Sequence, residues 1–105
     1  MMNLSFSGFD WDEGNREKCQ KNGISLTEIE NLFTHNPRVA PDPAHSVGGD
    51  RLIAVRRSNA GRPVFVAFTF RTKNKRRLIR PVTARYMHAK EIAAYEKESA
   101  TTEDR

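Results

Sequence analysis

The sequence predicts an α+β fold that has two N-terminal helices, an antiparallel sheet of three to four strands and a C-terminal helix. Apolar side chains recur at helical spacing in residues 25–33. Three stretches rich in β-branched and aromatic residues follow between positions 51 and 85, and short turns separate them. Ala, Glu and Lys dominate residues 89–99, which favours a final helix. Helices followed by a run of strands are typical of the α+β class.

The first part of the chain predicts two short helices around a tight turn. A short aromatic and acidic stretch at 9–12, either a strand or an extended entry, leads into a first helix at 13–23, which Gly23 is suited to end in the left-handed conformation. The second helix begins at Ser25, and Glu28 follows three residues later, which is the pattern of a capping box. One face of this helix is apolar and is expected to pack on a core: Leu26, Ile29, Leu32 and Phe33.

Strands are predicted at 51–58, 63–71 and 76–85, with turns at 59–61 and 72–75. The second of these strands is apolar on both faces, so we expect it at the centre of the sheet. Pro81 has no N–H to donate, which places it at a sheet edge or in a bulge. Residues 34–50 hold three prolines and two adjacent glycines, and they predict a loop with one short strand at 38–40.

The chain is expected to form a single domain over residues 1–105. A length of 105 residues with 37% hydrophobic content suits one modest core. The ordered part should run from about residue 9 to residue 98, and it ends in a closing helix at 89–99 that offers Ile92 and Tyr95 for packing. Residues 99–105 are predicted to fray.

Positive charge is concentrated in one part of the chain. Residues 1–50 hold four basic and eight acidic residues, residues 51–90 hold twelve basic and no acidic ones, and residues 91–105 hold two basic and five acidic ones. Seven of the fifteen residues at 71–85 are Lys or Arg. This segregation predicts a polyanionic partner, either nucleic acid or an acidic protein segment. A solvated face that only aids solubility is the alternative, but such faces usually mix both signs.

Composition argues against several classes of protein. No apolar run approaches the ~20 residues that cross a bilayer, and the first ten residues lack the apolar stretch of a signal peptide. We therefore expect a cytoplasmic protein without membrane contact. The single cysteine, Cys19, rules out an internal disulfide and a Cys-rich metal site. Because Cys19 lies in a helical pattern, a buried structural thiol is favoured over a nucleophile.

Four stretches stand out by their order and spacing: FDWDEGNREKCQKNGIS (9–25), DPAHSVGGDRLIAVRRS (42–58), VFVAFTF (64–70) and VTARYMHAKEIAAYEK (82–97). Together they resemble the BrnT family of toxins, from about Phe9 to Tyr95. The chain departs from the family pattern at Asn22, where the family usually has His, and at Gly49, where it usually has an acid. The usual Ile-Ser-Ala-Arg appears here at 82–85 as Val-Thr-Ala-Arg.

The resemblance implies a small ribonuclease with the RelE-like fold, acting as the toxin of a type II toxin–antitoxin system that inhibits translation and growth. It also implies a partner, a BrnA-like ribbon-helix-helix antitoxin encoded beside the toxin. In that family the toxin–antitoxin complex represses its own operon. Operator DNA is therefore expected to be contacted only through the antitoxin.

RNA can be cleaved without a metal ion, by attack of a 2′-hydroxyl on the adjacent phosphate. Arginines on a rigid sheet stabilise the charge that builds on the phosphoryl oxygens, and a general acid or base moves the protons. The sequence has no carboxylate cluster suited to Mg²⁺, no metal-ligand spacing of histidines and no Walker-type glycine loop, so we expect no metal and no other cofactor.

The catalytic candidates on these grounds are Arg51, Arg71, Arg80, Arg85 and His45. The candidates for contact with RNA or with the antitoxin are Lys73, Lys75, Arg76, Arg77, Tyr86 and His88. Tyr86 and His88 are also candidates for proton transfer, whereas His35 reads as a loop residue.

The main candidates also have structural alternatives. Arg51 is placed to pair with Asp42 or Asp50, and Arg85 is placed to pair with Glu91. A second function from another class stays open at this point. It is a non-catalytic module of the same fold that binds nucleic acid or protein through its basic residues.

Overall fold

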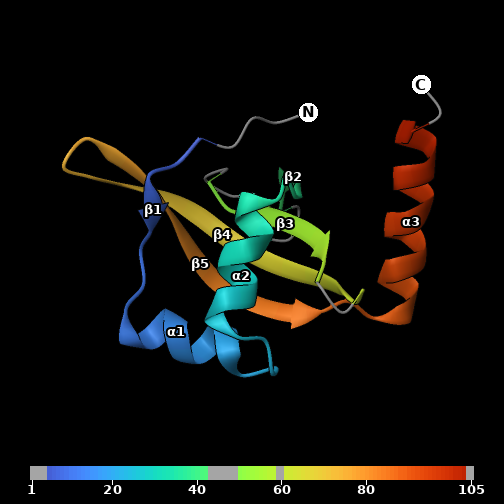
Figure 1. The fold of residues 1–105 in the computed structure, drawn as a ribbon, viewed down its shortest axis with the longest axis horizontal. Helices are drawn as coiled ribbons and strands as arrows, with labels where there is room; N and C mark the ends of the chain where they lie inside the picture. The colour runs from blue at the N-terminus through green and yellow to red at the C-terminus, as the bar shows by residue number, and fades with distance from the viewer. Residues whose placement is uncertain (1–4, 43–49, 59–60, 104–105) are drawn as a thin grey trace.

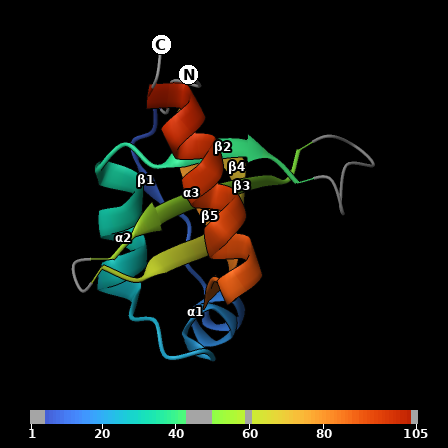
Figure 2. The same ribbon diagram turned by 90° about the vertical axis from the view of Figure 1, so that its right-hand side faces the viewer.

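The structure is a computed structural model that describes residues 5–42, 50–58 and 61–103, without the side chains of Tyr95 and residues 98–103. The elements described are β1 (Gly8–Phe9), α1 (Glu13–Gln20), α2 (Leu26–Thr34), β2 (Arg38–Pro41), β3 (Leu52–Arg57), β4 (Pro63–Lys73), β5 (Arg76–Tyr86) and α3 (Ala89–Glu103). Figures 1 and 2 show α2 over one face of the sheet, α1 below the β5 margin of the sheet, and α3 standing at the end where β5 leaves it. The predicted α+β class is therefore confirmed.

The sheet has five strands in the order β1-β5-β4-β3-β2, so the predicted number of three to four strands is wrong. The additional strand is β1, at the start of the stretch expected to be either a strand or an extended entry. It has two residues and pairs parallel with β5, Gly8 opposite Leu78 and Phe9 opposite Ile79. Two residues are too few to show an alternating pattern in a sequence. The other strand pairs are antiparallel, and β4 lies at the centre as predicted.

A bulge interrupts β5 beside its proline. Pro81 lies opposite Phe68 and Thr83 lies opposite Ala67, which leaves Val82 as an extra residue in β5. A bulge accommodates a residue that has no N–H for the ladder. This position confirms one of the two alternatives that were predicted for Pro81.

The strand β1 covers only a short part of the outer edge of β5. Beyond it, side chains donate hydrogen bonds to the backbone carbonyls of β5. The amide of Asn15 in α1 donates to the carbonyl of Pro81 at 2.9 Å. The amide of Asn22, in the turn after α1, donates to the carbonyl of Ala84 at 3.1 Å. Buried carbonyl groups need such partners, so α1 and its turn replace a sixth strand along this edge.

Capping residues mark the boundaries of both N-terminal helices. Asp12 accepts a bond from the Asn15 N–H at 2.9 Å, and the Asn15 side chain accepts one from the Asp12 N–H at 2.7 Å. The Ser25 hydroxyl accepts from the Glu28 N–H at 3.1 Å, which confirms the predicted start of α2. Gly23 has a φ of +86°, the left-handed conformation expected, although α1 ends before it at residue 20.

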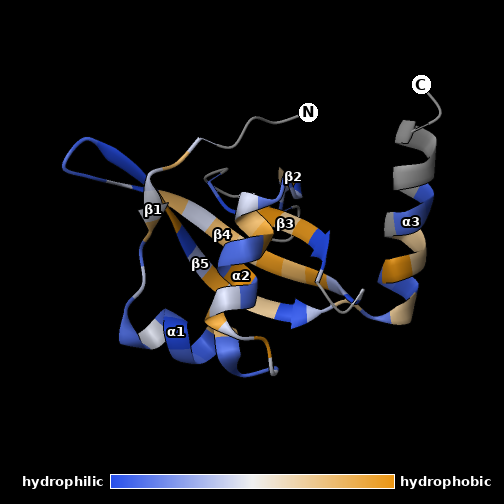
Figure 3. Cartoon of the chain, viewed as in Figure 1, coloured by the Kyte–Doolittle hydropathy of each residue, from blue (hydrophilic) through white to orange (hydrophobic). Residues whose placement is uncertain are grey.

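The core lies between the two N-terminal helices and one face of the sheet, and its buried members are Cys19, Ile24, Ile29, Leu32, Phe33, Ala54, Val64, Val66, Phe68, Ile79 and Ala84. Phe68 is fully buried, and its ring stands edge-on to Phe33 of α2 and to Phe70, with centroids 4.8 and 5.5 Å away. Figure 3 shows this apolar centre along β4. Cys19 has no exposed surface, which confirms the predicted burial of this thiol, and burial raises its pKa to about 11.

The C-terminal helix is longer than predicted. α3 continues to Glu103, so residues 99–103, expected to fray, are helical. The reason is that no Gly or Pro occurs in this segment to stop a helix. Figures 1 and 2 show α3 at the end of the sheet, away from α1 and α2. None of the helices described is long and apolar enough to span a membrane.

Candidate functional site

The face of the sheet opposite α1 and α2 is apolar at its centre and carries arginines at both ends of the sheet. Cross-strand partners share a face of a sheet, and successive residues of a strand alternate between faces. Three rows of partners define what we call the second face: Arg38, Val55, Phe65 and Arg85, then Ala40, Ile53, Ala67 and Thr83, then Thr69 and Arg80. The Arg85 guanidinium lies 4.4 Å from the centroid of the Phe65 ring, as this pairing requires.

Arg85 is held by a carboxylate from α3. Its Nη1 and Nη2 donate to the two oxygens of Glu91 at 2.7 and 2.8 Å, and the His88 N–H donates to the same carboxylate at 2.9 Å. The hydrogen bond from Arg85 lowers the pKa of Glu91 to about 2. The predicted pair between Arg85 and Glu91 is therefore confirmed. A phosphate presents the same two-oxygen geometry to a guanidinium fork.

The pair between Arg85 and Glu91 should persist in acid. A carboxylate with a folded-state pKa of about 2 contributes stability that is complete above its ordinary value of 4.5 and is lost as the pH falls through about 2. The two side chains are 31% and 34% exposed, so this contribution is small. We expect NMR to show the Glu91 carboxyl titrating near pH 2, and closer to 4.5 in Arg85→Ala. A wild-type titration near 4.5 would contradict the pair.

Arg80 lies in a closed network of charges beside the start of α1. Its Nη1 is 3.3 Å from Asp10 Oδ2, its Nη2 is 2.6 Å from Asp12 Oδ2, and Lys73 Nζ is 2.9 Å from Asp10 Oδ1. The hydrogen bond from Lys73 lowers the pKa of Asp10, and the backbone hydrogen bond from Asn15 lowers the pKa of Asp12. Both carboxylates therefore stay charged. Arg80 therefore links the segment before α1 to β5. This role is structural, whereas the sequence predicted a catalytic one.

Three of the four candidate arginines lie at one end of the second face: Arg51, Arg71 and Arg80. Arg51 stands opposite Asp42, whose N–H donates to the Arg51 carbonyl at 3.0 Å. The Nε of Arg51 is 3.1 Å from Asp42 Oδ2. One of the two pairs predicted for Arg51 is therefore confirmed. Arg71 is exposed and has no carboxylate partner within the described residues. Arg85 lies at the other end of the face, and His45 lies outside the described residues.

The hairpin between β4 and β5 is basic and exposed. Its turn is tighter than the predicted 72–75, because β4 extends to Lys73 and only Asn74 and Lys75 lie between the strands, with φ of +52° and +64°. Positive φ at both central residues is typical of a type I′ turn. All seven residues at 71–77, which we call the basic hairpin, are exposed, and five are cationic: Arg71, Lys73, Lys75, Arg76 and Arg77.

Tyr86 and His88 lie at the far end of β5 from the basic hairpin. Tyr86 stands opposite Val64 on the face that α1 and α2 cover, and the Arg62 guanidinium lies 3.6 Å over its ring. His88 is exposed and immediately precedes α3, where its N–H shares the Glu91 carboxylate with Arg85. The structure thus places His88 beside the Arg85 end of the second face and turns Tyr86 toward the other face.

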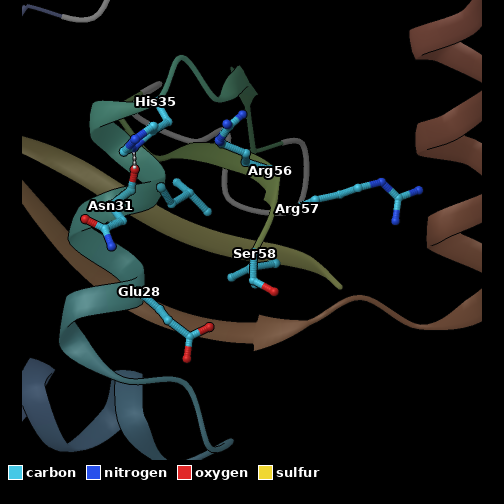
Figure 4. A pocket seen from close by; sticks show the side chains of 8 residues that line it. Glu28, Asn31, His35, Arg56, Arg57 and Ser58 are labelled. Carbon is cyan, nitrogen blue, oxygen red and sulfur yellow. Dashed lines mark hydrogen bonds between the residues drawn. The ribbon is translucent and has the colours of Figure 1, made fainter. Parts of the chain in front are cut away.

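A small pocket between α2 and the end of β3 had no signal in the sequence, because it forms only where these elements pack (Figure 4). Its volume is about 30 Å³, and its lining is Glu28, Asn31, Leu32, His35, Arg56, Arg57, Ser58 and Val64. His35 is the first residue after α2, in the loop as predicted, and its Nδ1 lies 2.7 Å from the Asn31 carbonyl, which can only accept. No group of three metal-ligating side chains occurs among the residues described.

These observations define a small α+β protein whose five-stranded sheet is covered by helices on one face and carries arginines on the other. The family model for the ribonuclease toxin BrnT of type II toxin–antitoxin systems matches residues 11–91. The chain therefore belongs to the BrnT family of ribonuclease toxins, as the resemblance predicted. Type II systems pair the toxin with a protein antitoxin, so the family implies a protein partner. A search among curated proteins found no match.

Proposed function

We propose that this chain cleaves RNA without a metal ion, inhibits translation and growth in the cytoplasm, and is neutralised by a BrnA-like ribbon-helix-helix antitoxin. Membership of the BrnT family supports the ribonuclease toxin class. The single observation that carries the mechanism is the filled fork of Arg85, in which two Glu91 oxygens lie at 2.7 and 2.8 Å. An RNA phosphate offers the same pair of acceptors in the same place.

In the proposed mechanism Arg85 clamps the scissile phosphate after that phosphate has displaced Glu91. The 2′-oxygen forms a bond to phosphorus and the bond from phosphorus to the 5′-oxygen breaks, which gives a 2′,3′-cyclic phosphate and a 5′-hydroxyl. One proton leaves the attacking hydroxyl and one is delivered to the departing oxygen. The guanidinium stabilises the negative charge that develops on the phosphoryl oxygens. Arg51 and Arg71, at the other end of the second face, are proposed to hold neighbouring phosphates.

His88 is the proposed proton-transfer group in the described part of the chain. Its side chain is exposed, and its backbone shares the Glu91 carboxylate with Arg85. Once a phosphate has displaced Glu91, the His88 imidazole and the released Glu91 carboxylate are both side chains of residues next to Arg85, so either is a candidate for proton transfer. His45 is the second candidate, on the sequence alone.

The antitoxin is proposed to cover the second face. Ile53, Val55 and Phe65 are half-buried apolar residues that lie among arginines. This pattern suits an amphipathic segment that has apolar residues at its centre and acidic residues at its margin. An acidic side chain on Arg85 would exclude RNA from the clamp. Operator DNA is proposed to be contacted only through the antitoxin.

One observation favours a second candidate function, a non-catalytic basic module that binds nucleic acid or protein. Arg51, Arg80 and Arg85 each already pair with a carboxylate, so most of the candidate arginines have a structural use. A module of this kind needs only exposed charge for binding, and the basic hairpin supplies it.

Incubation of the purified chain with end-labelled RNA in excess EDTA separates these functions. The proposed mechanism predicts cleavage in EDTA, with 2′,3′-cyclic phosphate on the new 3′ ends. Salt-dependent binding with intact RNA would favour the binding module. Cleavage that appears only after addition of a divalent metal would overturn the metal-free mechanism.

A further inference from the structure

The basic hairpin extends beyond the strands that flank it. The pairing of β3 with β4 stops at Leu52 and Phe68, and the pairing of β1 with β5 starts only at Leu78. The remaining ends of β4 and β5 pair with each other, and among the described residues one further backbone bond reaches them, from Ser7 N–H to the Arg77 carbonyl at 2.7 Å. Figure 1 shows the resulting two-stranded ribbon projecting past β1, at the end of the molecule remote from α3.

This ribbon is a fixed array of charges rather than a flexible loop. Thr72 lies opposite Arg77 and Lys73 lies opposite Arg76 up to the two-residue turn. The Arg77 guanidinium stacks 3.6 Å over the Phe70 ring. An array that is already ordered loses little conformational freedom on binding, so more of its interaction energy appears as affinity.

Charge covers both faces and the tip of the ribbon. Cross-strand pairing puts Arg71, Lys73 and Arg76 on one face and Arg77 on the other, while Lys75 lies in the turn. The residues at 51–90 contain no acid, and Lys73 is the one hairpin cation that a described carboxylate pairs. A flat anionic surface would engage one face of such a ribbon. In A-form RNA the narrow major groove has a phosphate backbone on each side, so cations on both faces of a ribbon laid across it lie near phosphates.

We propose that the basic hairpin is a separate anchoring site for the phosphate backbones of double-helical RNA. It holds a structured RNA while an unpaired part of that RNA reaches Arg85. Arg76 and Arg85 are nine residues apart along β5, which corresponds to about 30 Å. The two sites can therefore engage different parts of one RNA. This inference rests on the proposed ribonuclease function and names the class of RNA, stem-containing rather than unstructured, that binds best.

The double variant Lys75→Gln with Arg76→Gln tests the anchor, because it removes two charges and keeps the Lys73–Asp10 pair and the Arg77–Phe70 stack. The probes are a 2′-O-methyl RNA stem-loop, which has no hydroxyl to attack, and an unstructured 2′-O-methyl strand of equal length. Each dissociation constant is measured at several salt concentrations. The matched control is Arg16→Gln with Lys21→Gln, which removes two exposed charges near α1.

We expect the hairpin variant to bind the stem-loop about tenfold more weakly near 0.1 M salt, with a salt slope smaller by about 1.5, as expected for two lost phosphate contacts. The control should change neither value, and the unstructured strand should lose less affinity. An unchanged slope overturns the anchor. Equal losses on both probes overturn the preference for duplex RNA.

Cleavage of a short unstructured RNA keeps this inference distinct from the proposed function. At saturating RNA the hairpin variant should cleave that substrate much faster than Arg85→Ala does, and a loss as large as that of Arg85→Ala would place the hairpin in the cleavage step instead of in an anchor. If the wild-type chain cleaves no RNA, the ribonuclease proposal fails, while the binding data on the uncleavable stem-loop still decide the anchor.

Discussion

Replacement of Arg85 by alanine is expected to slow RNA cleavage at least about 100-fold while the fold is retained. Alanine offers no donor to the phosphate that the guanidinium fork is proposed to clamp. Folding should change little, because both members of the pair with Glu91 are about one-third exposed and such pairs contribute about 1 kcal/mol or less. Single-turnover rates on a short unstructured RNA measure the loss, and circular dichroism with urea unfolding verifies the fold.

Arg62→Ala is the matched control for this experiment. Arg62 also lies over an aromatic ring, Tyr86, but on the face that the helices cover. Equal losses of activity in the two variants would contradict a specific role for Arg85. Glu91→Gln examines the same fork from the other side, because the amide keeps the size and removes the competing charge. RNA affinity should rise in Glu91→Gln, and a fall would contradict the view that Glu91 occupies the phosphate position.

Phe68→Ala is expected to lower the free energy of unfolding by about 3–5 kcal/mol. Phe68 has no exposed surface and its ring meets two other phenylalanines, so alanine leaves a cavity that the rigid sheet cannot collapse into. Small domains have a total stability of about 5–15 kcal/mol, so this loss is a large fraction of it. Urea unfolding followed by circular dichroism gives the value from the shift of the midpoint.

Phe65→Ala is the internal comparison for the core. Phe65 lies in the same strand, but it is half-buried on the second face. Its loss should cost clearly less stability than the loss of Phe68 and should affect the Arg85 stack instead. If the two alanine variants are equally destabilised, the assignment of the core to the helix-covered face is wrong.

The order of the elements could be predicted because their signals are local. Ser25 with Glu28, Gly23 after the first helix and Pro81 in a strand each impose a conformation through their own chemistry. For β1 the sequence left a strand and an extended entry open, since bonds from Ser7 N–H to the Arg77 carbonyl and from Asp10 N–H to the Ile79 carbonyl hold it in place, rather than its own pattern.

The site could be predicted only in part, because pairing between charges depends on topology. The basic stretch and the pair between Arg85 and Glu91, six residues apart, were visible in the sequence. The partners of Arg80 were not visible, since Asp10 and Asp12 lie some seventy positions earlier and reach Arg80 only because β1 pairs with β5. The number of arginines in the sequence therefore overstates how many can bind RNA, because carboxylates already pair with several of them.

Expression of this chain alone in a bacterial host, beside its Arg85→Ala variant, shows whether the chain is a ribonuclease toxin that depends on Arg85. Growth and total RNA integrity are followed after induction, and soluble protein is quantified in both cultures. We expect growth arrest with RNA cleavage for the wild-type chain, and normal growth with intact RNA for Arg85→Ala. Normal growth and intact RNA with abundant soluble wild-type protein, or equal arrest by both chains, would contradict it.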